Sequence, residues 1–215
     1  MRLRVTFSKN GPLTYTSHLD LARIWERSLR RAGAPLAYSQ GFNPRPKLQL
    51  AAALPLGHTG EAEMLDVWLE ESGGERGRGE WGVGRLAKAL APALPDGLRV
   101  SQVRQVEAKE PALQTQITAA EYRVTVELPS GLDAKARIEG ILAAAELPQE
   151  RDGKQSDLRP LIERLWLERE GEEEVVLGMQ LAARAGATAR PEAVLETLGM
   201  GKAFARYHRQ RLILS

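Results

Sequence analysis

An aromatic residue stands among amides, prolines and positive charges in the segment YSQGFNPRPKLQL, residues 38–50. Pro44 and Pro46 fix their own φ angles and favour extended conformations at the residues before them, while Gly41 permits a turn with positive φ. An outward Phe42 in this stiffened segment would suit base stacking in RNA recognition. The accompanying candidate contacts to base edges and phosphates are Gln40, Asn43, Arg45 and Lys47. The alternative is a rigid hairpin tip in which Phe42 packs inward.

A histidine stands at the start of an expected helix in YTSHLDLAR, residues 15–23. Ser17 fits the N-cap position, and Asp20 lies three residues later in a capping-box-like position. His18 would then lie in the first helical turn, which attracts anions, and could contact a phosphate or act as an acid or base. The alternative is a first-turn histidine bonded to Asp20 or to the backbone. Two arginines of the same helix, Arg23 and Arg27, are further candidate phosphate contacts.

Two later segments combine charges at close spacing. RYHRQR, residues 206–211, is a basic cluster with an aromatic residue, which favours RNA contact. Its candidate contacts are Arg206, His208, Arg209 and Arg211. In RDGKQSDLRPLIERL, residues 151–165, Asp157 and Arg159 flank one leucine just before Pro160. These two side chains would share a face if extended, so an ion-paired structural turn and a ligand site are both open.

The residue types that are missing narrow the chemistry. The chain has no cysteine, which excludes disulfides, thiol nucleophiles and cysteine-ligated zinc or iron–sulfur sites. With three histidines, a histidine-rich metal site is not expected, and we predict no cofactor. The common nucleotide-loop, zinc-protease and serine-hydrolase motifs are also absent. A binding protein is therefore favoured over an enzyme.

Positive charge is concentrated at the two ends of the chain. Residues 1–60 contain nine Lys or Arg and two acids, residues 61–80 contain seven acids and two Arg, and residues 184–215 contain six Lys or Arg and two acids. Basic regions of this kind suit an anionic partner such as RNA, although a charged face can also be simply solvated. Neither a membrane-spanning apolar run nor a signal peptide is evident, so we expect a cytoplasmic protein without membrane contact.

Apolar periodicity predicts an α+β protein in which one order of elements, β-α-β-β-α-β, occurs twice. This order is typical of two tandem ferredoxin-like domains with antiparallel sheets, at residues 1–110 and 118–215. We expect their boundary near 108–118, which lacks periodic apolar residues, and a flexible Gly-rich connection at 72–80. The expected elements are 2–9, 17–32, 35–39, 47–56, 61–71, 83–94 and 98–107, then 121–129, 133–147, 161–170, 174–184, 190–200 and 209–215.

Three segments together resemble a bacterial family, the radical-SAM-linked proteins: YTSHLDLARIWERSLRRAGAPLAYSQGFNPRPKLQLAAALPLG, SDLRPLIERL and ARPEAVLETLG with YHRQR. The S-H-L-D and S-Q-G-F-N-P motifs are the most specific parts, and the family pattern usually has His at the position of Arg45. The resemblance implies a radical SAM enzyme as partner. Such an enzyme holds its cluster with three cysteines, so this chain would recognise, position or deliver a substrate instead.

These observations lead to one main hypothesis and two alternatives. The main hypothesis is a non-catalytic RNA-binding accessory module that works with a radical SAM enzyme on tRNA or rRNA. Its main site is expected in the first domain, to which the first helix contributes Arg23 and Arg27, and consists of His18, Gln40, Phe42, Asn43, Arg45 and Lys47. One alternative is a metal-independent endoribonuclease that uses His18 as acid and base, with Tyr15 and Lys47 beside it. The other is a protein–protein scaffold in which the acidic segment 61–80 docks the partner.

Overall fold

A computed structural model describes residues 1–70, 81–151 and 153–215 of the chain. The described residues form five α-helices and antiparallel β-sheets, which confirms the predicted mixture of helix and strand. The chain divides into two compact units, Met1–Gln116 (unit 1) and Ile117–Ser215 (unit 2). The Gly-rich connection predicted at 72–80 lies outside the described residues.

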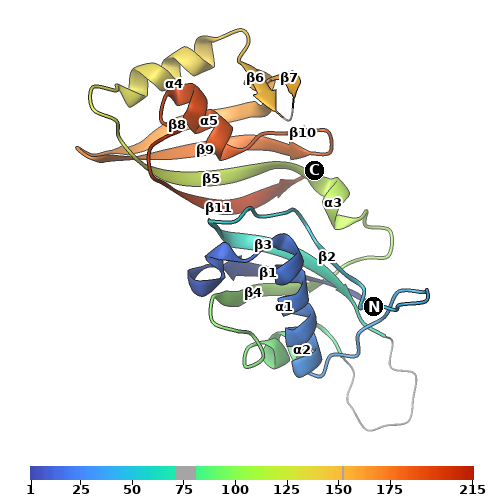
Figure 1. Ribbon diagram of the computed structural model, residues 1–215. Coiled ribbons are helices and arrows are strands. Elements are labelled where there is room, and N and C mark those ends of the chain that lie inside the picture. Colours follow the sequence, from blue (N-terminus) through green and yellow to red (C-terminus); the bar gives the residue numbers. More distant parts are fainter. Residues whose placement is uncertain (71–80, 152) are drawn as a thin grey trace, which may run out of the picture. The chain divides into compact units, whose positions relative to one another are not determined.

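Unit 1 is a four-stranded antiparallel sheet with two helices on one face (Figure 1). Its strands follow the order β2-β3-β1-β4 across the sheet. Its elements are β1 (Arg2–Lys9), the 3-10 turn η1 (Gly11–Tyr15), α1 (His18–Arg31), β2 (Leu48–Leu50), β3 (His58–Trp68), α2 (Val83–Leu90), β4 (Leu98–Gln105) and the short α3 (Leu113–Gln116).

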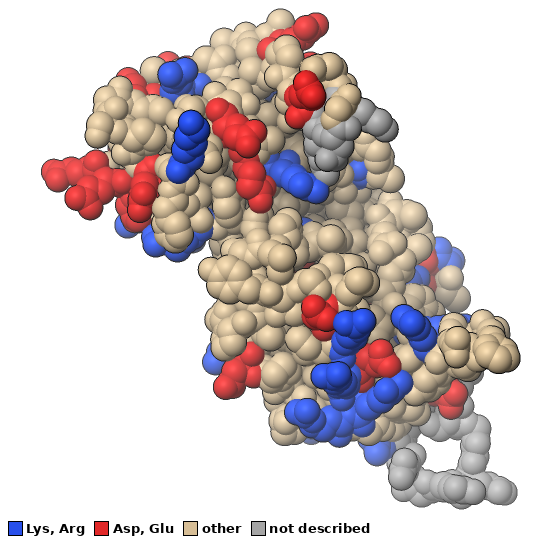
Figure 2. Space-filling model, viewed as in Figure 1, with Lys and Arg blue, Asp and Glu red and all other residues tan. Residues whose placement is uncertain are grey.

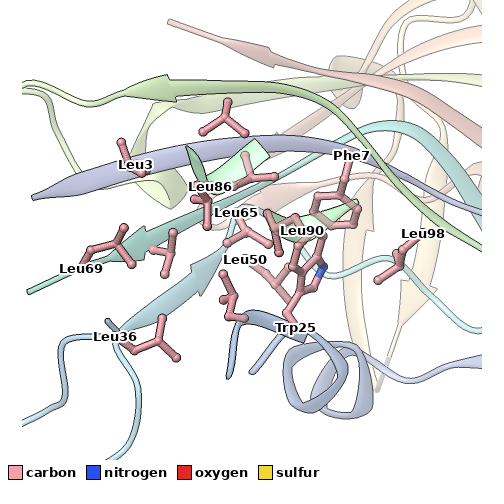
Figure 3. Close-up of a cluster of buried hydrophobic side chains, with 14 of the residues drawn as sticks. Leu3, Phe7, Trp25, Leu36, Leu50, Leu65, Leu69, Leu86, Leu90 and Leu98 are labelled. Carbon is pink, nitrogen blue, oxygen red and sulfur yellow. The ribbon is translucent and has the colours of Figure 1, made fainter. Parts of the chain in front are cut away.

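Strict alternation in β1 builds the core of unit 1. Leu3, Val5 and Phe7 point to the helix-covered face and are fully buried. On the facing side of α1, Trp25 meets Phe7 edge to face with 4.7 Å between the ring centroids, as the close-up in Figure 3 shows. The strand therefore has one apolar face, as the period of two predicts, and the helix is fixed to it by its buried aromatic residue.

Unit 2 repeats this architecture with longer strands, and α4 and α5 lie on one face of its sheet (Figure 1). The strand order is β11-β5-β9-β8, all antiparallel. The elements are β5 (Ile117–Glu127), α4 (Ala134–Ala143), β6 (Pro148–Arg151), β7 (Lys154–Asp157), the 3-10 turn η2 (Arg159–Leu161), β8 (Ile162–Glu170), β9 (Glu174–Arg184), β10 (Ala187–Thr188), α5 (Pro191–Leu198) and β11 (Ala205–Leu214). β6 and β7 form a separate hairpin, and β10 pairs with the end of β9.

The predicted order of major elements is observed in both units, with ends that differ by several residues. The exception is the strand expected at 35–39, which is reduced to two isolated bridges, Leu36 to Leu69 and Tyr38 to Pro46. The prolines in this region lack the N–H groups that a continuous ladder requires. The short pieces η1, α3, β6, β7 and β10 were not predicted, because they span too few residues to show a period.

The last segment of unit 1, which follows β4, is held against β1 and β4 by hydrogen bonds from arginine side chains. Arg2 donates from its guanidinium to the carbonyl oxygens of Glu110 and Pro111, both at 2.9 Å. Arg104 donates to both carboxylate oxygens of Glu110, at 2.7 and 3.0 Å, and this pairing lowers the pKa of Glu110 to about 2. Arg2 also donates from Nε to the fully buried Asp66 at 2.8 Å.

The two units divide between Gln116 and Ile117, inside the range 108–118 where we expected the boundary, although the segment before this point is packed against β1. The segment contains α3, and Leu113 and Gln116 are buried. Arg4, itself buried, donates to the side-chain oxygen of Gln116 at 3.4 Å. Periodic apolar residues are the sequence signal for packing, and here ionic and backbone contacts replace them.

Candidate nucleic-acid interface

Residues 36–47 form a narrow hairpin that ends in a five-residue tip, residues 40–44. Ser39 closes the stem twice: its N–H donates to the Arg45 carbonyl oxygen at 2.8 Å, and its Oγ accepts from the Arg45 N–H at 3.0 Å. The far side of the stem is bonded to β3, because the Trp68 N–H donates to the Lys47 carbonyl oxygen at 3.1 Å. The stem is thus fixed to the sheet, and the tip projects from the body of unit 1 (Figure 1).

Phe42 at this tip is completely exposed, with a relative accessibility of 101%. Gly41 adopts a φ of 144°, which a residue with a side chain rarely takes, and Pro44 limits the other side of the tip. The alternative in which Phe42 packs inward is therefore wrong. A large apolar ring that is held in solvent by a closed stem is free to contact a flat partner group.

The positive side chains of the hairpin and of α1 differ in whether an acid neutralises them. Arg23 pairs with Asp20 at 2.9 Å and Arg30 with Glu26 at 2.7 Å. By contrast, Arg27, Arg45 and Lys47 are exposed and form no side-chain hydrogen bond or ion pair with any residue that the structure describes. Figure 2 shows basic side chains gathered over α1, beside the projecting hairpin. These uncompensated cations are the groups best suited to phosphates.

The start of α1 has the geometry that the sequence predicts. The Asp20 N–H donates to Ser17 Oγ at 3.1 Å, and Ser17 Oγ donates to the Asp20 carboxylate at 2.7 Å. This hydroxyl, together with Arg23, lowers the pKa of Asp20. His18 follows the cap directly and is half-buried. Ser17 and Asp20 thus act as a structural cap.

A buried lysine organises the chain before α1. Lys9 is fully buried at the end of β1, and its Nζ donates to the carbonyl oxygens of Thr14, Thr16 and His58, each at 3.3 Å. One ammonium group therefore joins β1, the turn that leads into α1 and the start of β3. The lysine was not singled out in the sequence, because its place in the β1 alternation gives no sign that a cation replaces an apolar side chain.

The structure separates two groups of residues that we predicted to share one site. Thr16, two residues before His18, lies beside Lys9 at the end of β1, whereas Lys47 is bonded to Trp68, the partner of Arg2 at the start of β1. The run from Arg2 to Lys9 is about 23 Å long at 3.3 Å per residue. His18 and Lys47 are therefore at opposite ends of unit 1. The arrangement expected for an endoribonuclease, with Lys47 beside His18, is not present.

The tail segment RYHRQR is not the single basic patch that we predicted. As part of β11 its side chains alternate between the two faces of the sheet: Arg209 lies opposite the buried Tyr122 and is itself only 2% exposed. Arg206 and Arg211 are exposed, but they pair with Glu174 at 3.1 Å and Glu121 at 2.8 Å. His208 is half-buried. Strand alternation thus removes Arg209 from the candidate interface, and ion pairs neutralise Arg206 and Arg211.

Comparison with known proteins identifies the family to which the chain belongs. Residues 2–191 match the family described as "Uncharacterized protein conserved in bacteria (DUF2344)". The chain belongs to this family. The description does not mention radical SAM enzymes, so that predicted association remains a resemblance in sequence. No curated protein matches the chain.

Solved structures add information on the fold. A chain of "Crystal Structure of a Cbf5-Nop10-Gar1 Complex" matches with a TM-score of 0.52 at 13% identity, covering 98% of this chain and 48% of that chain. A chain of "Structure of H/ACA RNP bound to a substrate RNA containing 2'-deoxyuridine" matches with a TM-score of 0.47 at 11% identity, covering 96% and 47%. This family member thus spans about half the length of these chains, and at such identities only the fold of the first is informative.

The motif around Asp157 is structural. Asp157 Oδ1 accepts from the Leu147 N–H at 2.7 Å and from the Arg159 N–H at 2.9 Å. Arg159 donates to the carbonyl oxygens of Leu142, in α4, and Ile162, at 3.1 and 3.2 Å. Pro160 lies within η2, where its missing N–H is not needed. These bonds fix the end of α4 to the start of β8 and use the polar groups that a ligand would need.

In the described ranges no group of three or more His, Asp or Glu side chains could hold a metal ion. Within those same residues no helix is both long and apolar enough to cross a bilayer. Two large apolar side chains near His18, those of Leu19 and Leu56, are exposed. The sequence around each leucine did not predict this exposure.

Proposed function

We propose that the chain is an RNA-binding module whose main contact in unit 1 is the hairpin site, defined as Gln40, Phe42, Asn43, Arg45 and Lys47. The observation that carries the proposal is the complete exposure of Phe42 on a closed stem. Burying this ring against a nucleobase gains stacking energy, and the fixed stem limits the entropy that is lost on binding. Arg45 and Lys47 supply uncompensated charge beside it.

We also propose that each unit is a ferredoxin-like domain. We number the four main strands of each unit by their order along the chain. Their order across the sheet is then 4-1-3-2 in both units, namely β4-β1-β3-β2 in unit 1 and β11-β5-β9-β8 in unit 2. Each unit has its two longer helices between strands one and two and between strands three and four. Sheets of this kind are a common framework for RNA recognition, which supports the proposed function.

The partner in this proposal is a radical SAM enzyme that modifies tRNA or rRNA in the cytoplasm, and the chain itself is not catalytic. The S-H-L-D and S-Q-G-F-N-P motifs support this part through their resemblance to radical-SAM-linked proteins. Co-purification of the tagged chain from its native cells tests it. A radical SAM enzyme should be recovered with the chain, and its consistent absence after crosslinking would contradict this part alone.

The RNA part of the proposal is tested by the salt dependence of binding. Single-stranded contacts give a log–log slope of about −0.7 per phosphate, so the double variant Arg45→Ala, Lys47→Ala should lose about 1.4 from the magnitude of the slope. The matched control is Lys135→Ala, Arg137→Ala, which removes the same charge from the exposed face of α4. Equal slopes for the two double variants would show that the hairpin cations do not contact phosphate.

A further inference from the structure

The sheet of unit 2 has a second face, opposite α4 and α5, whose side chains form regular rows. We call it the open face. Tyr122, Leu177 and Met179 point to the helix-covered face and are buried, so their neighbours along the strands point to the open face. Strand register places Trp166, Gly178, Arg123 and His208 in one row across β8, β9, β5 and β11. The adjacent row is Arg164, Gln180, Glu121 and Arg211.

On the open face an indole from β8 lies on a glycine of the neighbouring strand β9. Trp166 is directly opposite Gly178, and a Cβ atom at Gly178 would overlap the indole atoms Cε2, Cζ2 and Nε1. The absence of a side chain at Gly178 therefore lets the ring lie against the backbone of β9 instead of standing away from the sheet. This gives a flat aromatic surface in the interior of the face, supported from below.

One cation on this surface is not neutralised. The guanidinium carbon of Arg164 lies 5.1 Å from the centre of the Trp166 ring, a cation–π contact. Arg164 forms no ion pair with any acid in the described part of the chain, whereas Arg123 is held by Glu168 at 2.7 Å and Arg211 by Glu121 at 2.8 Å. Arg123 and Arg211 are themselves 49% and 62% exposed, so solvent weakens both ion pairs.

We propose that the open face of unit 2 is a second RNA contact, which binds a single-stranded segment with one base stacked at Trp166 and the adjacent phosphate on Arg164. The proposal rests on the proposed function for the class of ligand, RNA, but not on the hairpin site. A flat ring in the interior of a sheet, with arginines around it, is the arrangement by which sheet surfaces bind unstacked bases without strong sequence preference. Of the three arginines in the two rows, Arg123 and Arg211 are paired with Glu168 and Glu121, so Arg164 supplies the uncompensated positive charge for the phosphate.

The test is ultraviolet crosslinking of the full chain to a short oligouridylate, with the crosslinked residues identified by mass spectrometry. Crosslinks in the peptide that contains Trp166 are expected, with or without crosslinks at Phe42. Crosslinks at Phe42 alone would overturn this inference and leave the proposed function standing. Crosslinks at Trp166 alone would support the inference and contradict the hairpin site. Complete absence of crosslinks would contradict both.

A pair of variants separates stacking from packing. Trp166→Phe keeps an aromatic ring over Gly178, and Trp166→Leu keeps an apolar cover without a ring. Trp166→Leu should weaken oligouridylate binding about tenfold, and Trp166→Phe should retain most of it. Equal affinity for both variants and the wild type, at equal melting temperature, would overturn the proposal. So would a wild-type dimer that Trp166→Leu dissociates while RNA affinity is unchanged, because the face would then be a protein contact.

Discussion

The ammonium group of Lys9 shows how one charged residue can fix three segments at once. Its hydrogen bonds to the carbonyl oxygens of Thr14, Thr16 and His58 are made in a site that solvent does not reach. A buried charge is tolerated only when such partners replace its hydration. The half-buried His18 therefore owes part of its position to Lys9, which holds the turn immediately before it.

Lys9→Met keeps the aliphatic volume but leaves the partly buried carbonyl oxygens of Thr14 and Thr16 and the buried one of His58 without this donor. We expect it to lower the free energy of unfolding by about 3 kcal/mol. The control is Lys47→Met, at an exposed lysine, which should change the free energy by no more than about 0.5 kcal/mol. Urea denaturation of both variants provides the comparison, and equal effects would mean that the carbonyl contacts of Lys9 are dispensable.

Replacing glycine by alanine should lower the stability of unit 2 at Gly178 and raise it at Gly140. Gly178→Ala places a methyl group against the indole of Trp166, so it should destabilise unit 2 by about 1–3 kcal/mol. Gly140→Ala, inside α4 with nothing within 4 Å of the added carbon, should stabilise it by about 0.5–1 kcal/mol through higher helix propensity. Thermal unfolding measures both, and a neutral Gly178→Ala would mean that the indole moves aside at no cost.

At the scale of elements, ion pairs hold the segment between β4 and unit 2. The pKa of Glu110 is lowered to about 2 by Arg104 and Arg4, against an ordinary value of 4.5. Because the folded-state pKa is the lower one, the stabilisation is fully present above pH of about 4.5 and is lost as the pH falls from there toward about 2.

The variant Glu110→Gln should therefore show a smaller loss of stability than the wild type over that pH range. Glu107→Gln is the matched control, because the Glu107 side chain is 71% exposed and its carboxylate pairs with the exposed Lys109 at 3.3 Å. Its pH profile should follow the wild type. Unfolding by denaturant at a series of pH values gives the comparison, and parallel profiles for all three proteins would show that Glu110 does not contribute to the acid response.

Most helices and strands were predictable from the sequence, because particular residues indicate where they begin and which side is buried. The alternation of Leu3, Val5 and Phe7 indicates a half-buried strand, and Ser17 with Asp20 indicates where α1 begins. The hairpin at 36–47 was predictable as a stiff turn from Pro44 and Pro46. The prediction that Phe42 points outward is confirmed by its complete exposure, although the turn residues alone are compatible with an inward ring.

Across the whole molecule, two of the errors arose because residues were grouped into one site by their types in the sequence and the fold separates them. His18 and Lys47 lie at opposite ends of unit 1, because the helix between them carries the chain along the length of the sheet. The cluster at 206–211 is divided between two faces, because β11 is a strand. Trp166 was overlooked for the opposite reason, since its support, Gly178, comes from the neighbouring strand.

The central claim is that Phe42 contacts RNA and not the protein core, and one variant tests it most directly. Phe42→Ala should weaken RNA binding by about one to two orders of magnitude, because base–aromatic stacking contributes roughly 1–3 kcal/mol. Its melting temperature should stay that of the wild type, because the ring has no buried surface to lose. Phe42→Tyr should restore binding, and Phe204→Ala, at another exposed phenylalanine in unit 2, should leave it unchanged.

The measurement is RNA affinity by fluorescence anisotropy, together with thermal unfolding of the same four proteins. A loss of affinity confined to Phe42→Ala, with all melting temperatures equal, is the predicted result. Unchanged affinity in a fully folded Phe42→Ala protein would contradict the account.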